Sequence, residues 1–112
     1  MKLRIDPEKI SFRLDFDELE LLLDKGEIQE ITKLPKGRLT YKVICLPAGG
    51  TARFQAEGSA CILSLPQNVI KGHKAALPSL KGITTEFDGQ NGSKIKVALE
   101  VNLKKKLKHS LE

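Results

Sequence analysis

Two cysteines and two histidines are the side chains of this sequence best suited to nucleophilic or metal chemistry. Cys45 and Cys61 both lie inside apolar runs, where a thiol is usually buried and inert. Neither stands beside a base or a helix start that would lower its pKa. His73 and His109 have no Cys, His or acidic residue at ligand spacing, and a zinc site needs three or four ligands. We therefore expect no catalytic residue, no metal and no cofactor.

Two further segments carry residue types that are common in active sites. Residues 89–94 are rich in glycine and end in Ser-Lys, but a phosphate-binding loop places its lysine before the serine and leads into a helix. Alternating residues flank this segment on both sides, which favours a hairpin turn. The acidic cluster within residues 15–20 is expected to cap a helix, so catalysis by paired carboxylates is not indicated.

Basic residues form two candidate anion-binding sets. The first alternates with apolar residues along several expected strands, so a closed sheet would gather some of its members on one polar lumen. Its members are Arg4, Arg13, Lys42, Arg53, Lys94 and Lys96. The second set is the tail, which contains Lys104, Lys105, Lys106 and Lys108. The tail would bind a polyanion weakly and with steep salt dependence, although a solvated extension is the simpler interpretation.

Charge and composition narrow the function classes. The 112 residues include 19 Lys and Arg against 14 Asp and Glu, and residues 102–112 supply four of those lysines but one glutamate. Most of the net charge of +5 therefore belongs to the tail, and the remainder is nearly balanced. Four Phe, one Tyr and no Trp leave few rings on which bases could stack. A module that reads a nucleic-acid sequence is not expected.

Length and hydropathy indicate one domain at residues 1–103 followed by the basic tail at 104–112. The final Leu111-Glu112 resembles a cloning scar. No apolar run approaches the ~20 residues that a bilayer crossing requires. The N-terminal residues lack the apolar core of a secretory signal, so we expect a cytoplasmic protein.

Alternation of apolar and polar residues dominates the chain and is typical of strands with one buried face. The expected strands are residues 2–6, 10–16, 27–34, 39–46, 51–57, 60–65, 83–88 and 94–101. Residues 27–34 fit least well, because Ile28 and Ile31 fall on opposite faces. Leucines at helical spacing predict a short helix over residues 17–25. Asp15 or Asp17 can cap its start, Asp15 and Glu18 have the spacing of a capping box, and Gly26 ends it. Pro66 begins a second helix at about 66–74.

These elements predict an α+β domain with a mainly antiparallel, strongly twisted sheet of about seven strands and two short helices. Short connections favour a meander, and a twisted sheet of this size has room to curl into a partial barrel. In a meander, Cys45 and Cys61 would lie roughly 9–10 Å apart on strands that are not neighbours, too far for a disulfide. We find no internal repeat in the sequence.

The order of elements resembles that of a small family of uncharacterised bacterial proteins, a domain of unknown function. The resembling stretches are Lys2-Leu3-Arg4-Ile5, Ser11-Phe12-Arg13-Leu14, the helix ending at Gly26, and Leu39-Thr40-Tyr41-Lys42. The resemblance covers most of the chain. It implies the fold and carries no activity that could be transferred.

Three functions from different classes follow. The first is a non-catalytic binding or interaction module of a bacterial cytosol, whose partner is another protein or a second copy at an edge strand. The second is a phosphate- or nucleotide-handling domain, similar in architecture to triphosphate tunnel enzymes but without their acidic N-terminal motif. The third is a weak polyanion binder that uses the tail. Neither a membrane nor a cofactor enters any of the three.

Overall fold

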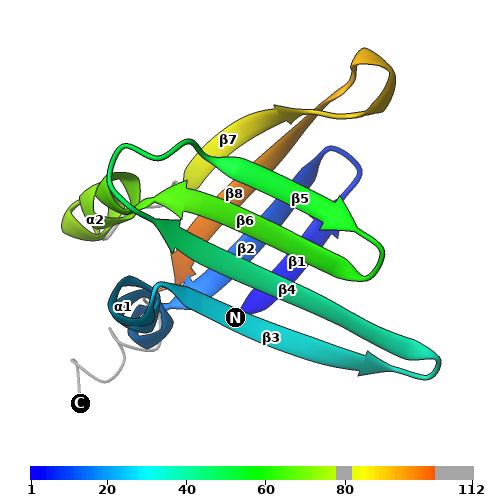
Figure 1. The fold of residues 1–112 in the computed structure, drawn as a ribbon, viewed down its shortest axis with the longest axis horizontal. Helices are drawn as coiled ribbons and strands as arrows, with labels where there is room; N and C mark the ends of the chain where they lie inside the picture. The colour runs from blue at the N-terminus through cyan, green and yellow to red at the C-terminus, as the bar shows by residue number, and fades with distance from the viewer. Residues whose placement is uncertain (78–81, 103–112) are drawn as a thin grey trace.

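The fold is built from two four-stranded sheets that face each other, with their strands crossing steeply (Figure 1). The computed structural model describes residues 1–77 and 82–102. In chain order the elements are β1 (Lys2–Asp6), β2 (Lys9–Asp15), α1 (Phe16–Lys25), β3 (Glu27–Leu34), β4 (Gly37–Leu46), β5 (Arg53–Glu57), β6 (Ala60–Pro66), α2 (Gln67–Ala75), β7 (Ile83–Asp88), the 3-10 turn η1 (Gln90–Gly92) and β8 (Lys94–Asn102). Sheet A has the strand order β1-β2-β8-β7, and sheet B has the order β3-β4-β6-β5.

The predicted α+β class and both helices are confirmed, but the strand pairing is not a meander. At the centre of sheet A, β2 pairs with β8 in parallel, and at the centre of sheet B, β4 pairs with β6 in parallel. Both sheets are therefore mixed and neither closes, so the expectations of a mainly antiparallel sheet and of a partial barrel are only partly right. The reason is that each helix carries the chain from one sheet to the other, which brings distant hairpins together.

The two halves of the chain repeat one order of elements, strand-strand-helix-strand-strand. The pairing within the hairpins repeats as well. In the β1-β2 hairpin the first residue of β1, Lys2, faces Arg13, and in the β5-β6 hairpin the first residue of β5, Arg53, faces Ser64. Each sheet contains one hairpin from each half. The repeat is not visible in the sequence, because the halves share buried apolar positions and not identical residues. Phe12, for example, stands where Leu63 stands in the other half, and both are fully buried.

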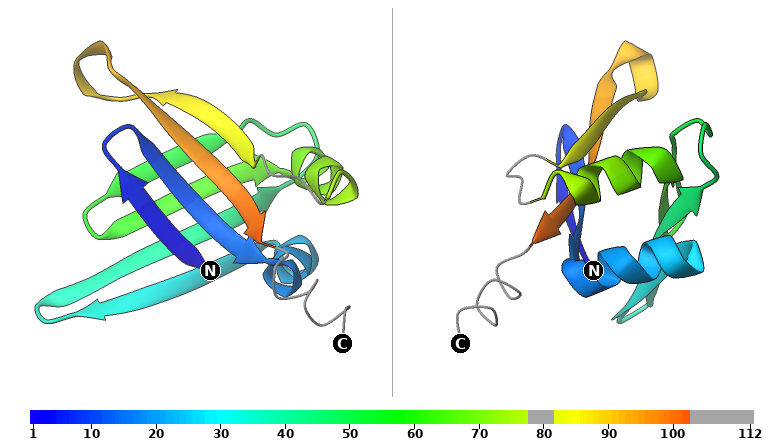
Figure 2. Two further views of the ribbon diagram at one scale, coloured as in Figure 1. Left: turned by 180° about the vertical axis from the view of Figure 1, so that it is seen from behind. Right: turned by 90° about the vertical axis from the view of Figure 1, so that its left-hand side faces the viewer.

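Helix α1 ends as predicted, begins one residue earlier, and has Asp15, and not Asp17, as its N-terminal cap. The Glu18 amide donates to Asp15 Oδ1 at 2.8 Å, and the Asp15 amide donates to Glu18 Oε1 at 3.1 Å, which completes a capping box. Gly26 adopts a left-handed conformation with φ of 87° and ends the helix. Figure 2 shows α1 and α2 side by side at one end of the molecule, where they bridge the two sheets. Among the described residues, no helix is long and apolar enough to cross a membrane.

The core lies between the sheets and closes against the helices. Its fully buried side chains are Phe12, Leu14, Leu19, Leu22, Val43, Leu63, Leu65, Ile70, Val97 and Leu99. Phe54 links the layers, because its ring lies 6.4 Å from that of Phe12 and 6.1 Å from that of Phe87. Since both sheets and both helices contribute, neither sheet has a core of its own.

Candidate functional site

The six basic residues of the first predicted set lie on outer faces of the two sheets and not in a shared lumen. Each has at least one neighbour on its strand that lies in or against the core, and side chains alternate between faces. Sheet A carries Arg4, Arg13, Lys94 and Lys96, and sheet B carries Lys42 and Arg53. The structure therefore divides the set between opposite sides of the molecule.

Four of these six residues form ion pairs with neighbours on their own sheet. Arg4 pairs with Asp6 at 3.3 Å, Arg13 with Glu100 at 3.2 Å, and Lys42 with Glu27 at 3.1 Å. Lys94 pairs with Asp88, and this contact holds the pKa of Asp88 below its ordinary value and that of Lys94 above it. Within residues 1–77 and 82–102, Arg53 and Lys96 form no salt bridge.

Glu100 is the centre of the charge network on sheet A. Its carboxylate accepts from Arg13 and lies 3.7 Å from Lys9 Nζ. Ser11 and Ala98 are partners in register on this outer face, and both are buried. The basic residues Lys9 and Arg13 are thus held on the outer face of sheet A by one carboxylate.

One shallow pocket on sheet A has a volume of about 440 Å³. It is lined by Glu8, Lys9, Glu86, Lys94 and Lys96. Three cations and two carboxylates give it a weak positive excess. This pocket is where the structure brings two of the predicted anion-binding residues together.

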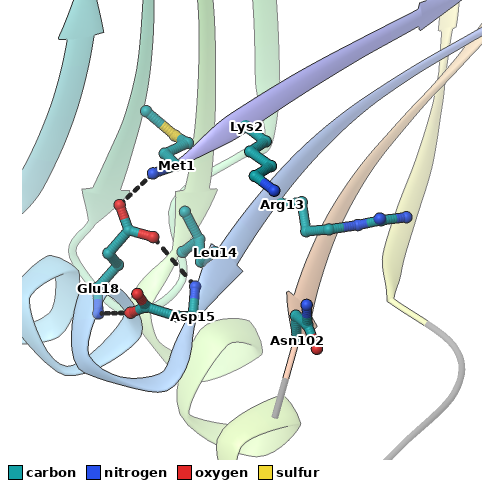
Figure 3. A pocket seen from close by; sticks show the side chains of 7 residues that line it. All are labelled: Met1, Lys2, Arg13, Leu14, Asp15, Glu18 and Asn102. Atoms are coloured by element: carbon teal, nitrogen blue, oxygen red, sulfur yellow. Dashed lines mark hydrogen bonds and ion pairs between the residues drawn. The ribbon is translucent and has the colours of Figure 1, made fainter. Parts of the chain in front are cut away.

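A second pocket, of about 360 Å³, lies where β1, β2 and the start of α1 meet (Figure 3). It is lined by Met1, Lys2, Arg13, Leu14, Asp15, Glu18 and Asn102. The Met1 ammonium pairs with Glu18 and lies 3.8 Å from Glu30. Asp15 and Glu18 belong to the capping box, so the carboxylates here hold the helix and the amine.

The two thiols lie on sheet B, Cys45 on β4 and Cys61 on β6. Cys45 and Cys61 are free, and burial raises the pKa of both. They lie on neighbouring strands and not two strands apart as expected. Since Cys61 pairs with Tyr41, Cys45 is four residues farther along β4, roughly 13 Å away. The offset along the strands, and not an intervening strand, therefore keeps the two thiols apart.

The part of the chain that the structure describes contains no cluster of side chains suited to metal binding. No group of three His, Cys, Asp or Glu residues is placed there to hold an ion. His73 lies in α2 with a buried Nε2 that has no hydrogen-bond partner, and burial lowers its pKa. The tail lysines Lys104, Lys105, Lys106 and Lys108, and His109, lie outside the described residues.

The free edge of sheet B, formed by β3, is a candidate site that the sequence patterns did not single out. This strand is eight residues long, whereas the other edge strands β1, β5 and β7 have five, five and six. Seven of its residues are exposed, including Ile31 at 44% and Leu34 at 51%. The sequence did contain one signal for this site. Ile28, Ile31 and Leu34 are spaced three residues apart, which departs from strict alternation and puts Ile31 on the outer face.

The backbone of β3 is oriented so that alternate amides point away from the sheet. The Cys45 amide donates to the Gly26 carbonyl at 2.8 Å, and these residues are opposite each other in register. In an antiparallel ladder, hydrogen-bonded pairs recur every second residue, so Ile28, Glu30 and Thr32 bond to β4. The amides of Gln29, Ile31 and Lys33 therefore face outward.

The architecture defines a two-layer α+β domain with a mixed sheet in each layer. The sequence matches a family of unknown function, DUF7009, over residues 1–107, and the chain belongs to that family. No curated protein matches the sequence.

Proposed function

We propose that this protein is a non-catalytic binding module that takes up an extended polypeptide strand at the free edge of β3. Strand addition satisfies the outward N–H and C=O groups of an edge strand, and side-chain contacts supply selectivity. The observation that carries the proposal is the long, exposed edge with outward amides at Gln29, Ile31 and Lys33. The two cysteines of the protein are free, which supports a reducing compartment. We therefore propose the cytoplasm as the location.

The other edges are less suited to this role. β1 and β5 are short, and each has a basic residue at one end and an acidic one at the other. β7 carries Glu86 and Asp88 on its outward face. Charges on an edge discourage pairing with another strand. β3 also carries charges, at Glu27, Glu30 and Lys33, but it is longer and has two exposed apolar side chains beside its outward amides.

Peptide binding combined with amide hydrogen exchange tests the proposal. The probe is a panel of ten-residue peptides in which apolar and polar residues alternate, each assayed with the full-length protein. We expect some members to bind and to slow exchange at Gln29, Ile31 and Lys33. Ile31→Pro should abolish this binding, because it removes the central outward donor. Binding that leaves these three amides unprotected, or an absence of binding across the panel, would refute the proposal.

A second candidate is recognition of a phosphate-bearing ligand at the lysine-lined pocket. Lys96 supports it, because this residue lines the pocket and has no salt bridge among the described residues. Under this alternative, inorganic polyphosphate or a nucleotide would raise the melting temperature. Lys96→Glu would remove the increase, whereas Arg53→Glu, on the opposite sheet, would keep it. Equal responses of the two variants would argue against this pocket.

A further inference from the structure

We infer that the strand taken up by β3 is β3 of a second copy of this chain, with a two-fold axis through Ile31; this rests on the proposed function. Two identical strands paired antiparallel in one sheet are related by an axis perpendicular to that sheet. Such an axis keeps each side chain on its own face, and neighbouring residues point to opposite faces. The axis must therefore run midway between one residue and its own copy, and we name each possible axis by that residue.

Strand length restricts the choice of that residue. With bounds of Glu27–Leu34, an axis on Glu30 or on Ile31 keeps seven residues of each copy paired. An axis on Gln29 or Thr32 keeps five. The two longer registers differ in the side chains that they place opposite each other, so the choice between them depends on side-chain chemistry.

An axis on Ile31 places each apolar residue of the paired segment opposite another apolar residue. Ile31 faces its own copy, and Ile28 faces Leu34 in both directions, because these residues lie at equal distances on either side of Ile31. Two exposed side chains per copy, Ile31 and Leu34, are thereby covered. On the outer face, Lys33 faces Gln29, so no like charges are opposed.

An axis on Glu30 is less favourable. It places Glu30 directly opposite its own copy, and like charges in that position destabilise a sheet. It also leaves Ile31 facing Gln29 and Leu34 beyond the last paired residue. It would pair Glu27 with Lys33, but exposed charge pairs contribute little, and Glu27 already pairs with Lys42 at 3.1 Å.

The outward amides and carbonyls of β3 can form a continuous ladder in this register. Because the Ile31 amide and carbonyl point away from β4, two copies of Ile31 exchange two hydrogen bonds across the axis. The flanking Gln29–Lys33 pairs have the same orientation and extend the ladder on both sides. The two copies of sheet B then form one continuous eight-stranded sheet. An interface of about seven residues a side is smaller than the usual ~20–30, so we expect a concentration-dependent dimer.

Sedimentation equilibrium over a protein concentration series tests the assembly. We expect the average mass to rise from 12.4 kDa toward twice that value at high concentration. Ile31→Lys places two ammonium groups opposite each other at the axis, and we expect it to weaken dimerisation at least tenfold. Ile5→Lys is the matched control, because Ile5 is an exposed isoleucine on the edge strand β1. It should dimerise like the wild type.

Cysteine crosslinking tests the register in a Cys45→Ser, Cys61→Ala background whose thermal melting confirms folding. Ile31→Cys should form an intermolecular disulfide, because hydrogen-bonded partners have Cα atoms about 5.5 Å apart. Glu30→Cys should not, because in this register its Cα lies roughly 8 Å from its own copy. The reverse pattern would overturn the register.

The outcomes separate this inference from the proposed function. A protein that stays monomeric at millimolar concentration, yet binds peptides with protection of Ile31, would refute the dimer and keep strand uptake. A monomer that binds no peptide would refute both. A dimer that survives Ile31→Lys unchanged would show a different interface and refute the inference.

Discussion

The half-buried histidine of α2 is a residue whose protonation state should affect stability. His73 Nε2 is buried without a hydrogen-bond partner among the described residues, and desolvation lowers the pKa of this imidazole. In the other half of the repeat, Leu22 occupies the equivalent turn of α1 and is fully buried. The core at this level therefore accepts an apolar side chain, and the charged imidazolium is the form that it disfavours.

We expect His73 to make the protein less stable as the pH falls. The folded-state pKa lies below the unfolded value of ~6.5, so the unfolded chain binds more protons in this range. Stability is full above the unfolded pKa and declines as the pH falls through the folded one. Urea unfolding at pH 7.5 and pH 5.0 measures the difference, which His73→Leu should reduce. An unchanged difference in this variant would assign the pH dependence to other groups.

Gly82 and Gly72 differ in the space available for a side chain. A Cβ at Gly82 would lie 2.4 Å from the Leu99 carbonyl oxygen and 2.8 Å from Glu100 Cγ, whereas a Cβ at Gly72 meets nothing within 4 Å. The close approach at Gly82 brings the start of β7 onto β8, beneath the Glu100 network.

Gly82→Ala should lower the free energy of unfolding by about 1–3 kcal/mol, the cost of overpacking a site bounded by backbone. Gly72→Ala, inside α2, should raise it by roughly 0.5–1 kcal/mol through helix propensity. Chemical denaturation of both variants measures the two changes. Equal effects would show that backbone entropy and not close contact explains Gly82.

At the scale of elements, the direction of the β3 amides makes neighbouring residues respond differently to proline. Thr32→Pro removes an amide that bonds to β4 and should cost about 1–3 kcal/mol, because it leaves a carbonyl of the ladder unpaired. Ile31→Pro removes an outward amide and should cost less, since edge positions that face solvent tolerate proline. Thermal unfolding compares the two at low protein concentration. A larger loss for Ile31→Pro would reverse our assignment of the amide directions.

Element positions were largely predictable because they depend on neighbours in the sequence. The alternation along Lys9–Asp15 and the capping box of Asp15 and Glu18 both appear in the structure as expected. Strand partners were not predictable in this way. No local pattern in either strand indicates that β2 lies beside β8, because that pairing joins residues from opposite ends of the chain, such as Phe12 and Leu99.

At the scale of the whole molecule, each sheet depends on both halves of the chain. Residues 1–50 supply one hairpin to sheet A and one to sheet B, and residues 51–102 do the same. Either half alone would leave the core side chains Phe12, Val43, Leu63 and Leu99 without the layer that covers them.

We therefore expect separate fragments of residues 1–50 and 51–112 to be unfolded and an equimolar mixture to recover the native sheets. Circular dichroism and proton–nitrogen correlation spectra of the fragments and the mixture measure this. A stable fold for one fragment alone would show that the repeat is an independent unit. That result would contradict the dependence of each half on the other.

The candidate site was predictable to a smaller degree than the fold. Alternation identified Arg4, Arg13 and Lys96 as surface cations, but whether they converge depends on which strands are neighbours. The exposed edge at β3 likewise depends on β4 having β6 on its other side.

The local elements and the apolar positions can be read from the amino-acid sequence alone, because they depend on residues a few positions apart. The parallel central pairs, the exchange of hairpins between the halves and the open edge at β3 emerge only when the chain is folded. Each of these depends on burying two sheets against each other, and burial rewards any apolar surface regardless of its distance along the chain.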